Sequence, residues 1–181
     1  MDVPFEFKTF SVKGVVLTTP KIFEDGRGFF LETYERDSFR KKGIDFEIVQ
    51  SNQSRSSRGV LRGLHFQKGE YAQAKLVKCI RGEIFDVAVD IRPESSTFGR
   101  YVGVKLTEQN KEMLYIPRGF AHGFEVISEN AEVLYNTDNK YILEQESGLI
   151  WSDSTIDINW PIKNPVLSNK DKKWPTLNEL K

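Results

Sequence analysis

The sequence predicts an all-β protein, a β-sandwich or barrel for which the antiparallel double-sheet jelly roll is the natural candidate. Short segments rich in Val, Ile, Phe and Tyr alternate apolar and polar residues, and clusters of Gly, Pro, Asn or Ser separate them. Helical periodicity is weak. Many short strands at even spacing are typical of these architectures, and a jelly roll protects strand edges by closing two sheets on each other.

The alternating segments are the expected strands. They are residues 46–52, 75–80, 83–91, 100–106, 112–117, 122–127 and 131–137. The dipeptide Arg81-Gly82 is a short-hairpin signal, so the two strands that flank it are expected to pair. Within the strand that follows, Asp86 falls on the face opposite Phe85, because successive side chains of a strand point to opposite faces.

The remaining elements are short. Residues 35–43 are expected to form one helix that ends at Gly43, and residues 107–113 are expected to form one or two helical turns that begin at Thr107. From Trp151 onward the chain has no regular pattern. This C-terminal tail is expected to be irregular and to pack across the barrel.

Length and composition narrow the class of protein. The 181 residues fit one domain, 1–181. Lys and Arg number 26, as do Asp and Glu, and the positive residues are spread along the chain, so nucleic acid is not an expected partner. No apolar run approaches the roughly 18 residues that a membrane span needs. The lone Cys79 and the early charges of residues 1–10 favour a cytoplasmic protein without a secretory signal.

The two histidines, His65 and His122, lie in GLHF and FAHGF, each beside glycine and apolar residues. An ordinary core or surface histidine is one reading of each. A metal site is disfavoured, because no second histidine follows His65 two residues on, where a strand would offer a pair on one face. Cys79 lies mid-strand with no feature that lowers its pKa, which favours a buried structural thiol over a nucleophile.

Acid–base catalysis by histidine is the remaining chemistry. A histidine with its ordinary pKa near 6.5 suits proton transfer, which typically contributes about 10²–10⁴-fold. A proton taken from carbon leaves an enolate oxygen that needs a cation or a donor. Lys75 would supply the cation if its strand pairs with the strand of His65, and Tyr135 would supply an acid. The alternatives are a solvated strand end for Lys75 and a core aromatic for Tyr135.

Strand parity raises a difficulty in the stretch GVLRGLHFQ (59–67). In a regular strand Arg62 and His65 would point to opposite faces. Either Gly63 marks a bulge, or Arg62 begins the strand where the backbone is not yet regular. Both arrangements permit a shared site.

A family resemblance covers nearly the whole chain. Its motifs are GRGFFLE (26–32), VQSN (49–52), GVLRGLHFQ (59–67), QAKLVKCIRGEIFDVAVDIR (73–92), YIPRGFAHGF (115–124), LYNTDNKY (134–141) and IWSD…INWP (150–161). In this order they resemble the dTDP-4-dehydrorhamnose 3,5-epimerase family. The resemblance implies a cupin-type jelly roll with short peripheral helices, usually a homodimer, that needs no metal or organic cofactor.

The resemblance also implies a mechanism. His65 would remove the protons at C3 and C5 of dTDP-4-keto-6-deoxy-D-glucose, Lys75 would stabilise the enolate oxygen, and Tyr135 would return protons from the other face. Asp171 matches the aspartate that pairs with the catalytic histidine, and a carboxylate there would fix the tautomer of the imidazole. From the residues alone, Asp171 is expected at the surface of a charged tail.

Substrate-binding positions carry over in the same way. They are Arg27, Phe30, Glu32, Gln50, Asn52, Arg62, His122, Tyr141, Glu146 and Lys170. Arg62 resembles the diphosphate ligand, a role that suits the paired donors of a guanidinium. Arg27, Phe30 and Glu32 match thymidine contacts, part of which reach in from the neighbouring subunit in the family. The chain departs from the family pattern at Ser51 and Gly26, where an acidic residue is usual.

Other functions share these motifs. A mono-epimerase would act only at C3 or C5 of a related dTDP-4-ketosugar, and sugar ketoisomerases are more distant relatives. A non-catalytic sugar-nucleotide binding module would require loss of the acid or the base. His65, Lys75, Tyr135 and Asp171 are all present in the sequence.

Overall fold

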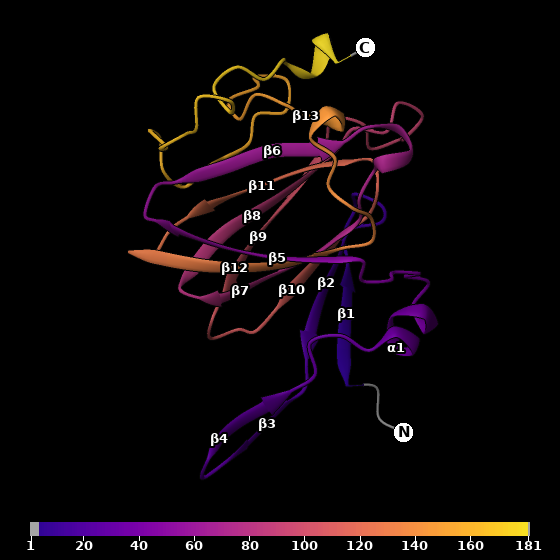
Figure 1. Ribbon diagram of the computed structural model, residues 1–181, viewed down its shortest axis with the longest axis vertical. Helices are drawn as coiled ribbons and strands as arrows, with labels where there is room; N and C mark the ends of the chain where they lie inside the picture. Colours follow the sequence, from indigo (N-terminus) through magenta and orange to yellow (C-terminus); the bar gives the residue numbers. More distant parts are fainter. Residues whose placement is uncertain (1–3, 181) are drawn as a thin grey trace.

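Two antiparallel sheets face each other, with a hairpin arm at one end and the C-terminal tail at the other, in the computed structural model, which describes residues 4–180 (Figure 1). The first three residues of the N-terminal segment lie outside this range. One sheet has six strands in the order β1 (Phe5–Thr9), β2 (Val16–Pro20), β10 (Met113–Ile116), β7 (Lys75–Arg81), β12 (Asn130–Thr137) and β5 (Gln50–Ser57). The other has five, in the order β13 (Glu146–Gly148), β6 (Leu61–Gln67), β11 (Phe120–Val126), β8 (Glu83–Asp90) and β9 (Tyr101–Thr107). The predicted double-sheet jelly roll is confirmed.

The arm and the helices are small additions. Strands β3 (Ile22–Asp25) and β4 (Gly28–Leu31) form the arm. The helix α1 (Arg36–Lys41) lies within the predicted range, with Glu35 as its N-cap. Three short 3₁₀ turns are η1 (Gly69–Tyr71), η2 (Leu143–Gln145) and η3 (Leu177–Glu179). Among residues 4–180, no helix has the length and apolar character that crossing a membrane requires.

Most predicted strands are confirmed, but the first, 46–52, is confirmed only over residues 50–52. Residues 46–49 lie outside any strand, and the strand there is β5, a polar segment that begins at Gln50. The strands β1 to β4 and β13 were not predicted. The helical turn or two expected over residues 107–113 is wrong: residues 108–110 form only a turn, in which Thr107 Oγ1 accepts the backbone N–H groups of Gln109 and Asn110, and β10 begins at Met113.

The predicted hairpin across Arg81-Gly82 is also wrong. Strand β7 pairs with β10 and β12, whereas β8 pairs with β11 and β9 in the opposite sheet. Gly82 lies at this crossing with φ of +77°, and a Cβ there would come 2.1 Å from the carbonyl oxygen of Asn130. Strand β6 likewise pairs with β11 and β13 and not with β7.

The main core fills the space between the sheets. Ile84 and Ala88 of β8 pack there against Val77 and Leu114 of the six-stranded sheet, as the alternation predicted. On the outer face of the five-stranded sheet, Val87 packs with residues of the tail. The tail residues Ile156, Trp160 and Leu177 are buried there. The irregular tail therefore covers the barrel, as expected.

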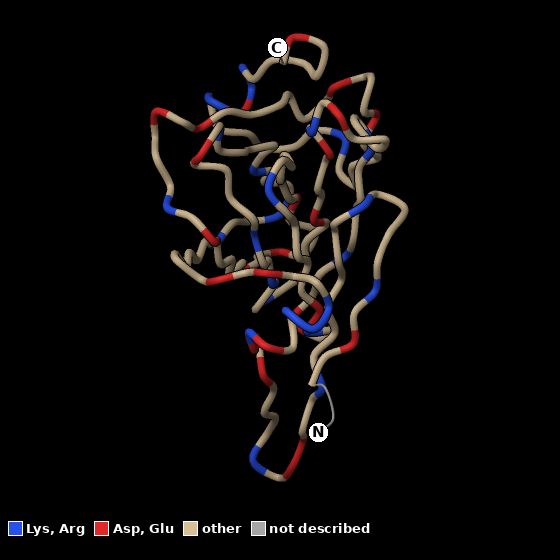
Figure 2. Tube along the Cα trace, turned by 90° about the vertical axis from the view of Figure 1, so that its right-hand side faces the viewer, with Lys and Arg blue, Asp and Glu red and all other residues tan. Residues whose placement is uncertain are grey.

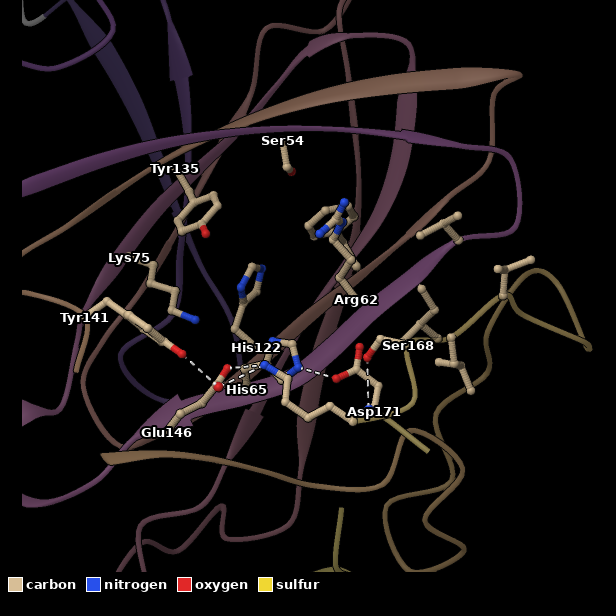
Figure 3. Close-up of a pocket in the computed structure, with 16 residues that line it drawn as sticks. Ser54, Arg62, His65, Lys75, His122, Tyr135, Tyr141, Glu146, Ser168 and Asp171 are labelled. Atoms are coloured by element: carbon tan, nitrogen blue, oxygen red, sulfur yellow. Dashed lines mark hydrogen bonds and ion pairs between the residues drawn. The ribbon is translucent and has the colours of Figure 1, made fainter. Parts of the chain in front are cut away.

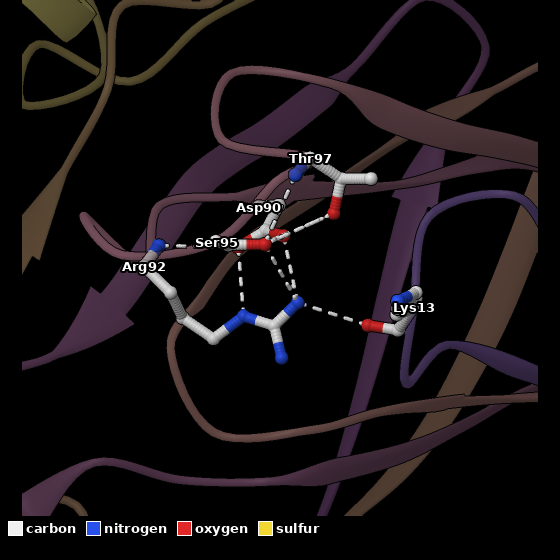
Figure 4. Close-up of polar contacts among 5 residues, drawn as sticks. All are labelled: Lys13, Asp90, Arg92, Ser95 and Thr97. Atoms are coloured by element: carbon white, nitrogen blue, oxygen red, sulfur yellow. Dashed lines mark hydrogen bonds and ion pairs between the residues drawn. The ribbon is translucent and has the colours of Figure 1, made fainter.

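A buried carboxylate ties two loops together at the end of β8 (Figure 4). Asp90 accepts hydrogen bonds from Arg92 Nε at 2.8 Å, Ser95 Oγ at 2.6 Å and Thr97 Oγ1 at 2.6 Å. Arg92 Nη2 also donates to the carbonyl of Lys13 at 2.9 Å. The loop after β8 is thereby joined to the loop between β1 and β2.

Charge is dispersed over the molecule. Lys and Arg are interspersed with Asp and Glu along the described trace, and neither sign dominates the face that Figure 2 shows. The spread of positive residues predicted from the sequence is confirmed for this view.

Candidate active site

A cavity of about 610 Å³ opens between the two sheets, and side chains from both sheets and from the tail line it (Figure 3). The residues that line it include Ser54, Arg62, His65, Lys75, His122, Tyr135, Tyr141, Glu146, Ser168, Lys170 and Asp171. A second cavity of about 250 Å³ shares His65, Lys75 and Tyr135 and adds Gln50 and Asn52. Most of the residues predicted for the site therefore converge.

The parity difficulty in β6 is resolved by a bulge. His65 lies opposite His122 of β11, and Arg62 lies opposite Phe124, so three steps along β6 match two along β11. Gly63 and Leu64 together lie opposite the single residue Gly123, and Gly63 has a φ of +136°. A β-bulge redirects side chains in this way. Both Arg62 and His65 consequently face the cavity.

His65 is paired with the tail. Its Nε2 lies 2.6 Å from Oδ1 of Asp171, which is 3% exposed. The expectation that Asp171 lies at the surface is therefore wrong, because the tail folds back over the site. Burial opposes ionisation of Asp171, but the hydrogen bond and charge of His65, together with hydrogen bonds from Ser168 and Trp174, outweigh it and lower the pKa of the carboxyl.

Lys75 is buried and faces the same cavity as His65, although their strands lie in opposite sheets. Burial lowers the pKa of Lys75 to about 8, and the negative charges of Asp86 and Glu146 limit that fall. An ammonium in this position is available to a developing negative charge in the cavity.

A second imidazole–carboxylate pair lies deeper. His122 Nε2 is 2.7 Å from Oδ1 of Asp86, and both side chains are buried. Burial lowers the pKa of His122, and Asp86 opposes that shift. Asp86 was not predicted as a site residue. The signal that would have found it is a carboxylate on the inward face of a strand, among Ile84 and Ala88.

Tyr135 projects from β12 on the face that carries Val133, as predicted, and burial raises the pKa of its hydroxyl. At the rim, Glu146 accepts hydrogen bonds from Tyr141 Oη at 2.9 Å and Lys170 Nζ at 2.7 Å. Sequence reasoning also missed Ser56, whose Oγ accepts the Nε–H of Arg62 at 3.0 Å. That contact orients the guanidinium.

Two polar residues of β5 lie beside each other in the second cavity, where Gln50 Nε2 donates to Asn52 Oδ1 at 2.8 Å. The predicted contacts Arg27, Phe30 and Glu32 do not line either cavity of their own chain. Arg27 and Phe30 lie on the arm, which extends away from the barrel (Figure 1). Cys79 is fully buried, and burial raises the pKa of its thiol to about 12, which confirms the structural interpretation.

The fold and the site together define a class. A jelly roll in which an imidazole–carboxylate pair, a buried ammonium and a tyrosine hydroxyl meet in one cavity has the architecture of a cupin-type enzyme. The family model described as dTDP-4-dehydrorhamnose 3,5-epimerase matches residues 9–179. The chain belongs to the dTDP-4-dehydrorhamnose 3,5-epimerase family.

Individual relatives agree with this family. A dTDP-4-dehydrorhamnose 3,5-epimerase of Shigella flexneri is 53% identical over 161 residues, 88% of this chain and 89% of the relative. The crystal structure of the Elizabethkingia anophelis enzyme of that name has a TM-score of 0.94 at 44% identity and covers 98% of both chains. A Legionella pneumophila epimerase in complex with dTDP-4-keto-L-rhamnose has a TM-score of 0.94 at 41% identity, over 98% of this chain and 95% of that one.

Proposed function

We propose that the chain epimerises dTDP-4-dehydro-6-deoxy-D-glucose at C3 and C5, giving dTDP-4-dehydro-L-rhamnose by enolisation and reprotonation. The observation that carries the proposal is the placement of a base and an acid on opposite sides of one cavity. His65 belongs to the five-stranded sheet and Tyr135 to the six-stranded sheet, and both face the space between them (Figure 3). Inversion at carbon requires proton removal from one face of the sugar and proton delivery to the other.

The first step uses the His65–Asp171 pair. The carboxylate accepts the Nε2–H of His65, which leaves Nδ1 as the basic atom of the ring. Nδ1 takes a proton from C3 or C5, both acidified by the C4 ketone between them, and the electron pair of the C–H bond passes to the ketone oxygen. The ammonium of Lys75 stabilises that enolate oxygen.

The second step uses Tyr135. Its hydroxyl gives a proton to the same carbon from the opposite face, and the enolate electrons return to form the C–H bond. The raised pKa of Tyr135 keeps the hydroxyl protonated until that step. Arg62, held by Ser56, binds the diphosphate through its paired donors. The remaining substrate contacts in this proposal are Gln50, Asn52, His122, Tyr141, Glu146 and Lys170.

The nucleoside end involves a second copy of the chain. The arm carries Phe23, Phe29 and Phe30, which are 49%, 56% and 64% exposed, far more than is usual for such side chains. In a homodimer the arm would bring Arg27, Phe30 and Glu32 to the thymidine in the partner's cavity. Mixing Arg27→Ala and His65→Ala chains tests this arrangement. A shared site restores activity in the mixed dimer, and a site built from one chain leaves the mixture as inactive as its components.

The enzyme is further proposed to work as one domain in the cytoplasm, where a lone thiol such as Cys79 stays reduced.

Solvent-deuterium incorporation tests the reaction. The enzyme and its ketosugar nucleotide are incubated in D₂O, the sugar positions are read by proton NMR, and the L-configured product is trapped with a reductase. Label at both C3 and C5 is expected, and His65→Ala should lose it. Label at one carbon would reassign the chain as a mono-epimerase. No label, with dTDP still bound, would make it a binding module.

A further inference from the structure

Trp174 contacts the catalytic pair from outside the cavity. Its indole Nε1–H donates to Oδ1 of Asp171 at 3.2 Å, the same oxygen that lies 2.6 Å from Nε2 of His65. The indole ring also lies edge-on to the His65 ring, with centroids 6.0 Å apart and planes at 70°. Trp174 does not line the substrate cavity. Any effect it has on the reaction must therefore pass through the cavity residues that it contacts, namely Asp171, His65 and Lys170.

The position of the indole is fixed by the neighbouring strand. Gly148 of β13 lies opposite His65 in the register, and a Cβ at Gly148 would come within 2.6 Å of the indole ring. The backbone that follows is held as well, because the N–H of Ile150 donates to the carbonyl of Pro175 at 2.9 Å. Glycine at 148 thus leaves the space that the indole occupies.

We propose that Trp174 is a positioning residue for the His65–Asp171 pair: its indole N–H fixes the rotation of the Asp171 carboxylate and shares the negative charge of Oδ1. This inference rests on the proposed function, in which Asp171 orients the base. A hydrogen bond to a charged group is stronger than one between neutral groups, so the indole is an effective partner for the carboxylate. The part of the negative charge of Oδ1 that the indole N–H stabilises is less available to stabilise an imidazolium at His65.

Other charged or titratable groups also face His65. They are Asp171, Glu146, Lys170, Lys75, His122, Arg62, Tyr135 and Tyr141. Lys170 is ion-paired with Glu146, and its Nζ lies 6.0 Å from the centroid of the Trp174 ring. An aromatic replacement of Trp174 retains a ring beside Lys170 and His65. Trp174→Phe therefore removes the N–H donor and leaves these groups in place.

Two measurements on Trp174→Phe test the inference. The chain has only two histidines, so the ring signals of His65 can be followed by NMR without substrate and assigned by their loss in His65→Asn. The titration midpoint of His65 is expected to move to higher pH by roughly half a unit, about threefold in the protonation equilibrium. The kcat should fall severalfold with KM unchanged, and the acid limb of the kcat profile should move in the same direction.

The matched control is Trp160→Phe. Trp160 also lies in the tail, and its indole donates to the carbonyl of Trp151 at 2.9 Å, away from the catalytic pair. This variant should leave the His65 midpoint unmoved. Replacement of Trp174 by β-(3-benzothienyl)alanine, which keeps the indole shape without the N–H, serves if the Phe variant does not fold.

The inference is overturned if the His65 midpoint is the same with and without the indole donor, or if Trp160→Phe moves it equally. The NMR titration needs no turnover. If the wild-type chain failed to epimerise its substrate, the proposed function would be wrong, but the titration would still show whether Trp174 acts on His65.

Discussion

Arg62 and His65 face one cavity because the β6 strand carries one residue more than its partner between them. The pairings of His65 with His122 and of Arg62 with Phe124 fix this offset. The bulge contains Gly63 and Leu64, and the carbonyl of His122 and the Cα of Gly123 lie directly against Gly63. The group that would bind the diphosphate and the group that would act as base are thus joined by one close backbone contact.

Gly63→Ala is expected to destabilise the fold and abolish turnover. A Cβ at this position would lie 2.5 Å from the Cα of Gly123, and φ of +136° is rarely adopted by residues other than glycine. Thermal unfolding measures the loss. Gly69→Ala is the matched control, since Gly69 also has a positive φ of +56° but nothing within 4 Å of its added Cβ. Equal changes in Tm for the two variants would contradict the role of close packing.

The strands that sequence could predict are those whose inward side chains are apolar. Strands β7, β8 and β12 alternate because their inward residues fill the core. Strand β5 was placed too early because its residues QSNQSRSS are polar on both faces. Its inward side chains line the cavities instead of the core, as Asn52 and Ser54 do. A local pattern therefore fails where a strand has no apolar face.

The pairing of strands and the tertiary contacts were harder to predict from the sequence. The Arg81-Gly82 turn has hairpin chemistry, yet Gly82 passes the chain from one sheet to the other, and nothing local distinguishes the two outcomes. Asp171 is 106 residues from His65 and lies among lysines, so its charge pattern indicates solvent. Only the family resemblance predicted their contact. Neither the residue pattern nor the family resemblance predicted Asp86 as a site residue.

Tyr135→Phe separates removal of the proton from its return. His65, Asp171 and Lys75 remain, so exchange of the C3 or C5 proton with solvent should continue with retention of configuration. Formation of the L-configured product should fall by about 10²–10⁴-fold, the usual contribution of a general acid. Proton NMR in D₂O follows both processes in one sample. Product formed at the wild-type rate would exclude Tyr135 as the acid.

Lys75 predicts a basic limb in the pH profile. Its pKa is lowered to about 8, so the ammonium that stabilises the enolate prevails below that pH and is lost above it. The kcat/KM of the free enzyme should therefore fall as pH rises through about 8. In Lys75→Arg the cation persists, and this limb should disappear even though the altered geometry lowers the rate.

The control for Lys75 comes from its own strand. Lys78 has the opposite strand parity and does not line the cavities, so Lys78→Gln should retain the basic limb. If the limb near pH 8 survived in Lys75→Arg, another group would have to account for it.

Asp90 should make the fold dependent on pH in acid. Burial opposes ionisation of Asp90, but hydrogen bonds from Arg92, Ser95 and Thr97 outweigh it and lower its pKa to about 2 (Figure 4). A carboxyl with a lowered pKa in the folded state stabilises the protein above its unfolded pKa, near 3.8, and this contribution is lost as pH falls towards 2. The contribution is on the order of 2 kcal/mol in the free energy of unfolding.

Asp90→Asn should therefore lower the free energy of unfolding at pH 7 and flatten its dependence on pH between about 4 and 2. The amide cannot accept from Arg92 on both oxygens, and it leaves the buried hydroxyl of Thr97 without a charged acceptor. Urea denaturation at a series of pH values measures both effects. Asp45→Asn breaks an exposed ion pair with Arg40, which is worth little, and should change neither quantity appreciably. If Asp90→Asn retained the wild-type slope in acid, the pH dependence would have to come from other carboxylates, among which Asp171 also has a lowered pKa and also lies buried against a cationisable partner.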